Sequence, residues 1–154
     1  VGREWVDAML GHLIDAFLLG TVPLATESER QRNSNPRKLY PADPGLIVAF
    51  DASGRANVGH ALETVVFNEL ERRGAEVGYV KTEAGLEVDF LARQAAGGQE
   101  LLQVCADPTS PDVRERELRA LAASARLRRA SASATPGVEV MPAYEWLLAT
   151  SGRP

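Results

Sequence analysis

The clearest structural signal in this chain lies in residues 57–106, which have the sequence NVGHALETVVFNELERRGAEVGYVKTEAGLEVDFLARQAAGGQELLQVCA. Asn57 is a favourable N-cap, apolar residues follow it at helical spacing, and Gly74 supplies a stop, so the first part of the segment predicts a helix. Three β-prone stretches come next, at residues 77–81, 86–92 and 100–106. The turn between the first two stretches is typical of a hairpin, so the segment predicts a helix followed by a three-stranded antiparallel meander.

The residues after this segment extend the pattern. Ser110 and Pro111 predict the start of a helix that ends near Arg129. Residues 138–141 predict a short strand, and Pro142 opens a last helix. A strand, a crossover helix and a further strand form a right-handed unit, which would place the last strand parallel to the third. We therefore predict an α/β fold in which helices cover a mixed sheet.

The residues before the segment predict a separate, smaller unit. It contains a helix at 4–16, a β-prone stretch at 17–24, a strand at 37–40 and a small apolar segment at 46–50. Residues 26–37 are almost wholly polar, so we expect a mobile loop there. This order resembles the end of a winged helix. The sequence thus predicts a winged-helix remnant and connection at 1–50 and the main domain at 51–154.

Composition narrows the classes of function. The 154 residues carry a formal net charge of -4, which argues against a surface dedicated to a phosphate backbone. The longest apolar run is interrupted at Gly20 and Pro23 and is shorter than the roughly 18 to 20 residues of a membrane span. Cys105 is the only cysteine, which excludes an intramolecular disulfide and fits a reducing cytoplasm. The chain begins without an initiator Met, so we expect an internal piece of a longer protein.

Two carboxylates stand out because of their surroundings. Glu63 lies on the apolar stripe of the helix, where charged residues are unusual, although a position at the edge of that stripe with a local partner explains it equally well. Asp89 lies inside a strand, where Asp is depleted, and shares a strand face with Glu87. Because a shared polar pocket is the best environment for such groups, we predict that Glu63 and Asp89 lie close together.

The third predicted strand adds an amide and a thiol. By strand alternation Gln103 and Cys105 share one face. Both have simpler interpretations, since a free cysteine in a strand is usually a small buried hydrophobe and a glutamine can be a hydrogen-bonded core residue. His12 and His60 have no second ligand at metal spacing, and we assign neither to catalysis.

The rest of the sequence contains few residues that indicate phosphate binding or phosphate chemistry. The sequence contains no glycine-rich phosphate-binding loop, so ATP hydrolysis cannot reside in this piece. Only Lys38 and Lys81 are available for a lysine-dependent reaction, and pairing across the hairpin would place Lys81 near Leu86 rather than Asp89. The arginines of residues 114–129 are diluted by glutamates, which favours a solvated helix face.

Five motifs in the same order resemble a known family. They are KLY at 38–40, DPGL at 43–46, GHALE at 59–63, EVDF at 87–90 and LQVC at 102–105. Together they are similar to the C-terminal domain, called domain of unknown function family 4143, of bacterial and archaeal AAA+ ATPases. The resemblance runs from about Trp5 to Leu148. It implies an ATPase domain in the parent protein and a module with the restriction-endonuclease-like αβββαβ core of PD-(D/E)XK nucleases.

The resemblance also implies a site. In active nucleases of this type a helix Glu, a strand Asp and the Glu of E-x-K hold a divalent metal, while the Lys orients the attacking water. Carried over by position, Glu63 matches the helix acid, Asp89 the strand acid, Gln103 the second acid and Cys105 the lysine. Glu63 and Asp89 are then the expected metal ligands, with Mg²⁺ as the cofactor of an active form. Gln103 and Cys105 depart from the catalytic pattern and remove two charged groups.

These departures favour one of three functions. The first is a nuclease-fold module that has lost catalysis and acts in binding or regulation, with the ATPase domain of the parent chain as its partner. The second is a metal-dependent DNA or RNA phosphodiesterase with a rearranged site, and the third is a nucleic-acid-binding module. The first function is favoured by the Q-x-C sequence at residues 103–105 and by the acidic net charge. A homo-oligomer is compatible with each of the three functions, and no membrane partner is expected.

Overall fold

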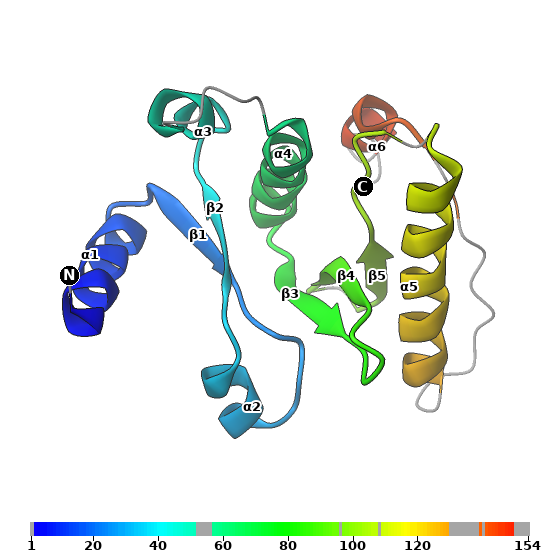
Figure 1. Ribbon diagram of the computed structural model, residues 1–154, viewed down its shortest axis with the longest axis horizontal. Helices are drawn as coiled ribbons and strands as arrows, with labels where there is room; N and C mark the ends of the chain where they lie inside the picture. The colour runs from blue at the N-terminus through cyan, green and yellow to red at the C-terminus, as the bar shows by residue number, and fades with distance from the viewer. Residues whose placement is uncertain are drawn as a thin grey trace.

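The chain has a mixed α/β fold with two small antiparallel sheets (Figure 1). The computed structural model describes residues 2–51, 57–95, 97–107, 109–129, 139 and 141–149. The helices are α1 (Arg3–Asp15), α2 (Glu29–Ser34), α3 (Gly45–Phe50), α4 (Val58–Arg72), α5 (Pro111–Arg129) and α6 (Ala143–Ala149). The strands are β1 (Leu19–Val22), β2 (Lys38–Pro41), β3 (Glu76–Lys81), β4 (Glu87–Arg93) and β5 (Gln99–Leu102).

The predicted helix and meander are confirmed as α4 and the sheet β3-β4-β5. Asn57 caps α4, since its side chain accepts a hydrogen bond from the backbone N–H of His60 at 3.1 Å. The hairpin between β3 and β4 is closed by hydrogen bonds between Thr82 and Leu86 (2.8 Å) and between Gly85 and Thr82 (2.9 Å). Gly85 adopts a φ of 78°, a left-handed conformation that favours glycine at this turn.

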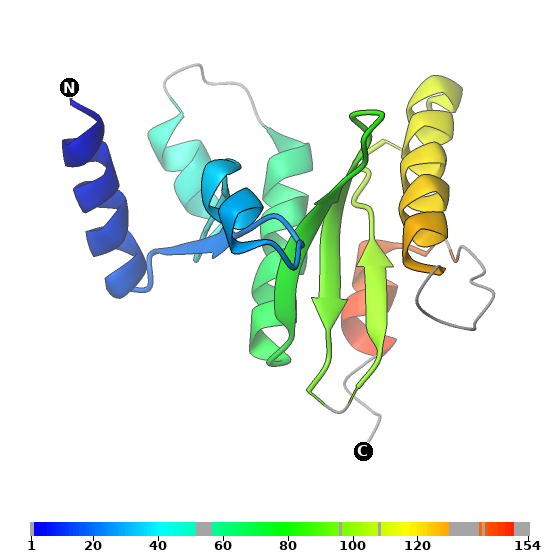
Figure 2. The same ribbon diagram turned by 90° about the horizontal axis from the view of Figure 1, so that it is seen from below.

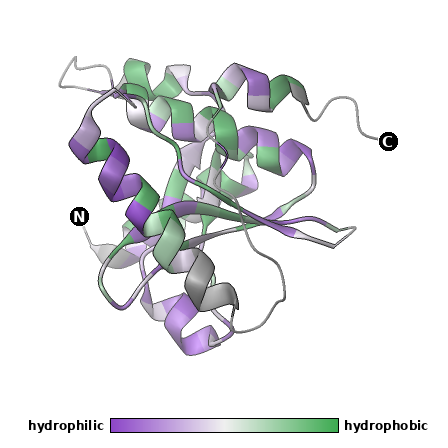
Figure 3. Cartoon of the chain, turned by 90° about the vertical axis from the view of Figure 1, so that its right-hand side faces the viewer, coloured by the Kyte–Doolittle hydropathy of each residue, from purple (hydrophilic) through white to green (hydrophobic). Residues whose placement is uncertain are grey.

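Helices cover both faces of the three-stranded sheet (Figure 2). Successive residues of β4 point to opposite faces, and Phe90 belongs to the core cluster with α4 and α6, whereas Leu91 belongs to the cluster with Ala120 of α5. Much of the remaining surface of α5 is hydrophilic (Figure 3), as expected for its arginines and glutamates. No helix among the described residues is long and apolar enough to cross a bilayer.

The second sheet, β1-β2, is joined to the first by backbone contacts beyond β1. Leu24 forms an isolated parallel bridge with Tyr79 of β3. The N–H of Ala25 donates to the carbonyl of Tyr79 at 2.8 Å, and the N–H of Tyr79 donates to the carbonyl of Pro23 at 2.9 Å. Gly78 makes this approach feasible, because a Cβ there would lie 3.0 Å from the Cβ of Ala25.

One core spans the division predicted at residue 50. Tyr40 of β2 is fully buried and stacks on Phe67 of α4, with ring centroids 5.1 Å apart. Its ring also meets that of Phe90 of β4 in a tilted arrangement, with centroids 5.4 Å apart. Val22 of β1 belongs to the same cluster as Trp146 of α6. The division into 1–50 and 51–154 stays a prediction, and the packing across it is extensive.

Three sequence predictions need correction. Residues 29–34, expected to be part of a mobile loop, form α2, because Ser28 caps the helix and Arg32 donates to the carbonyl of Thr26 at 2.7 Å. The third strand ends at Leu102 rather than residue 106, because the N–H of Val104 turns to the side chain of Asp89 at 3.0 Å. The three-stranded sheet of the described residues is antiparallel rather than mixed. The predicted strand at 138–141 falls partly on residues outside the described ranges, and Glu139 and Met141 are not in a strand.

Candidate functional site

The centre of the candidate site is the carboxylate of Asp89, a buried residue in the middle of β4. Its Oδ1 accepts a hydrogen bond from Lys38 Nζ at 2.9 Å. Its Oδ2 accepts one from Gln103 Nε2 at 2.7 Å and one from the backbone N–H of Val104 at 3.0 Å. Both oxygens of this carboxylate therefore have donors from within the chain.

Lys38 reaches Asp89 from β2, 51 residues away in the sequence. Its Nζ also lies 2.9 Å from Oε1 of Glu87, so one ammonium bridges two carboxylates of the same strand. The ammonium is 5.8 Å from the centre of the Tyr79 ring. Burial lowers the pKa of Lys38, but the two carboxylates outweigh it and the pKa lies above its ordinary value, so Lys38 is charged at neutral pH.

The same strand supplies a donor to the second carboxylate. Tyr40 is two residues from Lys38, and its hydroxyl donates to Oε2 of Glu63 at 2.8 Å. Burial raises the pKa of Tyr40, and the nearby charge of Glu63 adds to this, so the hydroxyl keeps its proton. Burial also raises the pKa of Glu63, as does the negative charge of Asp89, while the Tyr40 hydrogen bond and the Lys38 charge offset part of the effect.

The carboxylates that Lys38 and Tyr40 bind line a groove of about 370 Å³ between α4, β4 and α5. Its polar lining residues are Glu63, Glu87, Asp89, Gln103, Arg116 and Glu117. Glu63 and Asp89, which the sequence assigns to one pocket, thus line the same groove. The lining holds four carboxylates and one guanidinium, and Arg116 is itself paired with Glu117 at 2.5 Å.

Gln103 and Cys105 lie beyond the end of β5, where strand alternation no longer applies. Gln103 binds Asp89 through both ends of its amide, since Oε1 also accepts from the backbone N–H of Asp89 at 3.3 Å. Cys105 is a free, half-buried thiol. The amide therefore supports Asp89, and it does not act as a second acid.

The donor set does not fit the divalent metal that the nuclease resemblance implies. Hard cations favour several charged oxygens, yet Asp89 is held by three donors and both ends of the Gln103 amide are occupied. Among the described residues, no group of three or more His, Cys, Asp and Glu side chains is arranged to hold a metal ion. No metal-dependent step follows from this arrangement.

Sequence reasoning missed the roles of Lys38 and Tyr40. Both belong to the KLY motif, and Lys38 is one of two lysines in the chain, but no local pattern links β2 to β4. Lys81 lies opposite Glu87 on the exposed end of β3. His60 stacks on Tyr40 with ring centroids 5.3 Å apart, which is a packing contact.

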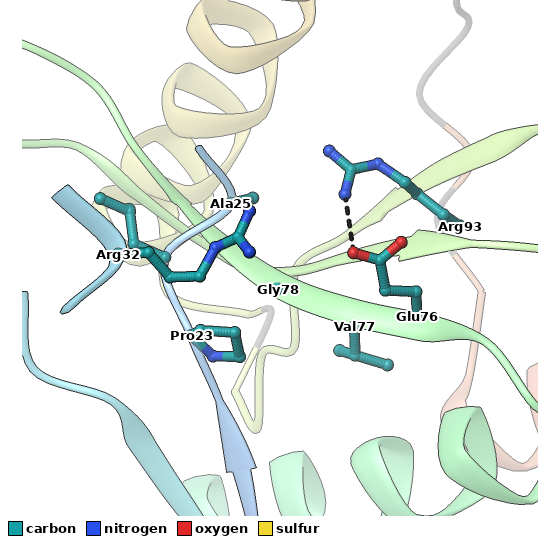
Figure 4. A pocket seen from close by; sticks show the side chains of 8 residues that line it. Pro23, Ala25, Arg32, Glu76, Val77, Gly78 and Arg93 are labelled. Atoms are coloured by element: carbon teal, nitrogen blue, oxygen red, sulfur yellow. Dashed lines mark hydrogen bonds and ion pairs between the residues drawn. The ribbon is translucent and has the colours of Figure 1, made fainter. Parts of the chain in front are cut away.

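A second, smaller cavity of about 80 Å³ lies where the chain leaves β1 and passes β3 (Figure 4). Arg93 on one side is paired with Glu76 at 3.2 Å. Arg32 on the other side donates to the carbonyl of Thr26. Both guanidinium groups are thus engaged within the chain.

Comparison with known proteins finds a distant archaeal relative. The chain is 34% identical over 124 residues to an uncharacterized protein of Methanocaldococcus jannaschii, in a match that covers 78% of this chain and 26% of that protein. The chain therefore matches about a quarter of its relative's length. No protein-family model matches the chain, and no solved structure matches it significantly.

Proposed function

We propose that this chain is a nuclease-fold module of a larger AAA+ ATPase that has lost metal-dependent cleavage and acts in binding or regulation. The ordered motifs support the family assignment, and a helix followed by an antiparallel meander is compatible with the nuclease fold. The observation that carries the loss of cleavage is the state of Asp89, whose two carboxylate oxygens accept hydrogen bonds from Lys38, Gln103 and Val104.

The hydrogen bonds to Asp89 matter because metal-assisted phosphodiester hydrolysis needs carboxylate oxygens that bind a cation. The cation stabilises the negative charge that develops during the reaction. A metal ion approaching Asp89 would have to displace an ammonium or an amide that is already paired, and both of these contacts are part-buried. Such contacts stabilise the folded chain, so binding a metal would cost the free energy of breaking them.

The charge of the groove favours a partner other than nucleic acid. Glu63, Glu87, Asp89 and Glu117 outnumber the cations that pair with them, which are Lys38 and Arg116. A phosphate backbone is repelled by such a surface. The ATPase domain of the parent chain or a second copy of the module is the partner that this proposal retains.

Cleavage assays test the proposal directly. Plasmid and oligonucleotide substrates are incubated with the purified chain and with its full-length parent, in Mg²⁺ or Mn²⁺, alongside Asp89→Ala. We expect background cleavage from both proteins, because losing even one transition-state charge donor commonly costs about 100- to 1,000-fold. Robust cleavage that Asp89→Ala abolishes would instead establish the phosphodiesterase alternative, whereas cleavage that survives the substitution indicates a contaminant.

A further inference from the structure

The Lys38 ammonium occupies a position in which a metal ion would have two carboxylate ligands. Nζ lies 2.9 Å from an oxygen of Glu87 and 2.9 Å from an oxygen of Asp89. These two residues share one face of β4, and Glu63 lines the same groove close enough for the charges of Asp89 and Lys38 to affect its pKa. Carboxylate oxygens are the ligands that Mg²⁺ and Mn²⁺ prefer.

The fold holds this ammonium in place. The β2 strand is paired with β1, with Lys38 opposite Val22, and is anchored in the core by Tyr40. The side chain of Lys38 is only 21% exposed, and it passes beside the ring of Tyr79, whose hydroxyl donates to the carbonyl of Pro36 at 2.9 Å. The lysine is therefore part of the packed structure and is not a surface side chain that exchanges with solvent ions.

We infer that Lys38 is a built-in cation that takes the place of a divalent metal, and that removing its charge opens a metal site at Glu87 and Asp89. This inference rests on the proposed loss of metal-dependent cleavage. Lys38 on β2 is then one cause of that loss, and the departures at Gln103 and Cys105 are others. The carboxylates of β4 are then still competent ligands, and the ammonium keeps other cations out.

Calorimetric titration with MnCl₂ and MgCl₂ tests this inference, together with thermal denaturation in each salt. The variants are Lys38→Met, which keeps the length and apolar stem without the charge, and the same change combined with Asp89→Asn. Lys81→Met is the matched control, because it removes the other lysine from an exposed position on the neighbouring strand. We expect no saturable binding by the wild-type chain or Lys81→Met. Lys38→Met should bind Mn²⁺ saturably because the carboxylates of Glu87 and Asp89 lose their shared ammonium, and the double variant should not.

The results of the titrations distinguish a failure of the proposed function from a failure of the inference about Lys38. Metal binding by the wild-type chain as tight as by Lys38→Met would contradict the proposed function, because Asp89 would then be available despite its donors. No binding by the wild-type chain and none by a folded Lys38→Met would overturn the inference and leave the proposed function standing. Circular dichroism reports folding, and Lys38→Gln is the second variant if Lys38→Met unfolds. A rise in the melting temperature of Lys38→Met or Lys38→Gln on addition of Mn²⁺ supports the inference. An unchanged melting temperature in both of these variants contradicts it.

Discussion

Lys38 and Tyr40 show how two residues of one short strand accommodate two carboxylates at the edge of a core. They are two positions apart on β2, so they lie on one face, and each reaches a different acid. Lys38 supplies a charge to Asp89, whereas Tyr40 supplies a neutral donor to Glu63. The two carboxylates therefore depend on different kinds of donor, one charged and one neutral.

Lys38→Met should lower the free energy of unfolding by about 1–3 kcal/mol, because Asp89 and Glu87 lose their shared cation in a part-buried setting. The pKa of Lys38 is higher in the folded chain than its ordinary value of 10.5, so its contribution is complete below that value and is lost as the pH rises through the folded value. Urea denaturation at neutral and at alkaline pH measures the difference. Lys81→Met, an exposed substitution, should change the free energy of unfolding by no more than about 0.5 kcal/mol. An equal loss of unfolding free energy in both variants would show that the Lys38 ammonium does not stabilise the chain through Asp89 and Glu87.

Glu63→Gln should stabilise the chain at neutral pH. The pKa of Glu63 is raised above 4.5 on folding, so the folded state is favoured where the group is protonated and loses stability as the pH rises through the folded pKa. Glutamine cannot ionise, yet it still accepts the hydrogen bond from Tyr40. We expect melting temperatures that match the wild-type chain near pH 4 and exceed it by a few degrees, on the order of 2–4 °C, at pH 7. A variant that is less stable than wild type at pH 7 would show that the charge of Glu63 is needed.

The site could be predicted from the sequence only in part. Glu63 and Asp89 stand out because a charged residue on an apolar stripe or inside a strand has an unusual local context. Lys38 has an ordinary context, and its role depends on a contact across 51 residues. The sequence offers Gln103 either as the counterpart of a second acid or as a hydrogen-bonded core residue, and its amide binds Asp89 from a segment that lies beyond the end of the strand.

At the scale of elements, the clearest predictions concern α4 and the hairpin that follows. Helical spacing, an N-cap and a glycine turn are local signals, and the structure confirms all of them. Helix α2 lacks an apolar stripe and is held by its cap and by polar contacts such as the one from Thr26 to Gln31 at 2.8 Å, so periodicity could not reveal it. The bridge between Leu24 and Tyr79 joins distant segments and has no sequence signature.

The packing of β1 on α4 gives a prediction with an internal control. A Cβ on Gly20 would lie 2.3 Å from Cε1 of Phe67, so Gly20→Ala forces the core ring or the strand to move. Overpacking of this kind costs typically about 1–3 kcal/mol. Gly11 lies inside α1, and a methyl group added there would have nothing within 4 Å, so Gly11→Ala should instead stabilise by about 0.5–1 kcal/mol. Chemical denaturation of both variants checks the opposite signs, and a neutral Gly20→Ala would mean that β1 is not packed on Phe67.

At the scale of the whole molecule, the core cluster joins Val22 and Tyr40 to Trp146. Arg73, the residue after α4, strengthens the far end of this cluster, because its guanidinium lies 4.0 Å from the centre of the Trp146 ring. Burial therefore links elements from before residue 50 to the last helix. If the chain unfolds as one unit, the predicted winged-helix remnant and the nuclease-like region are a single thermodynamic domain.

The last prediction tests that cooperativity. Trp5 is 59% exposed on α1 and Trp146 is 9% exposed in the core, so Trp5→Phe leaves one fluorescence reporter at the C-terminal end of the cluster. In that background, fluorescence and circular dichroism should give the same unfolding midpoint, as expected for two-state unfolding. Tyr40→Ala, at the other end, should lower both midpoints together, because removing a buried aromatic ring costs about 3–5 kcal/mol. A fluorescence transition that Tyr40→Ala leaves unmoved, beside a circular dichroism curve with two steps, would show that residues 1–50 and 51–154 unfold independently. Coincident shifts would show instead that β2, which supplies Lys38 to the carboxylates of Glu87 and Asp89, also stabilises the core.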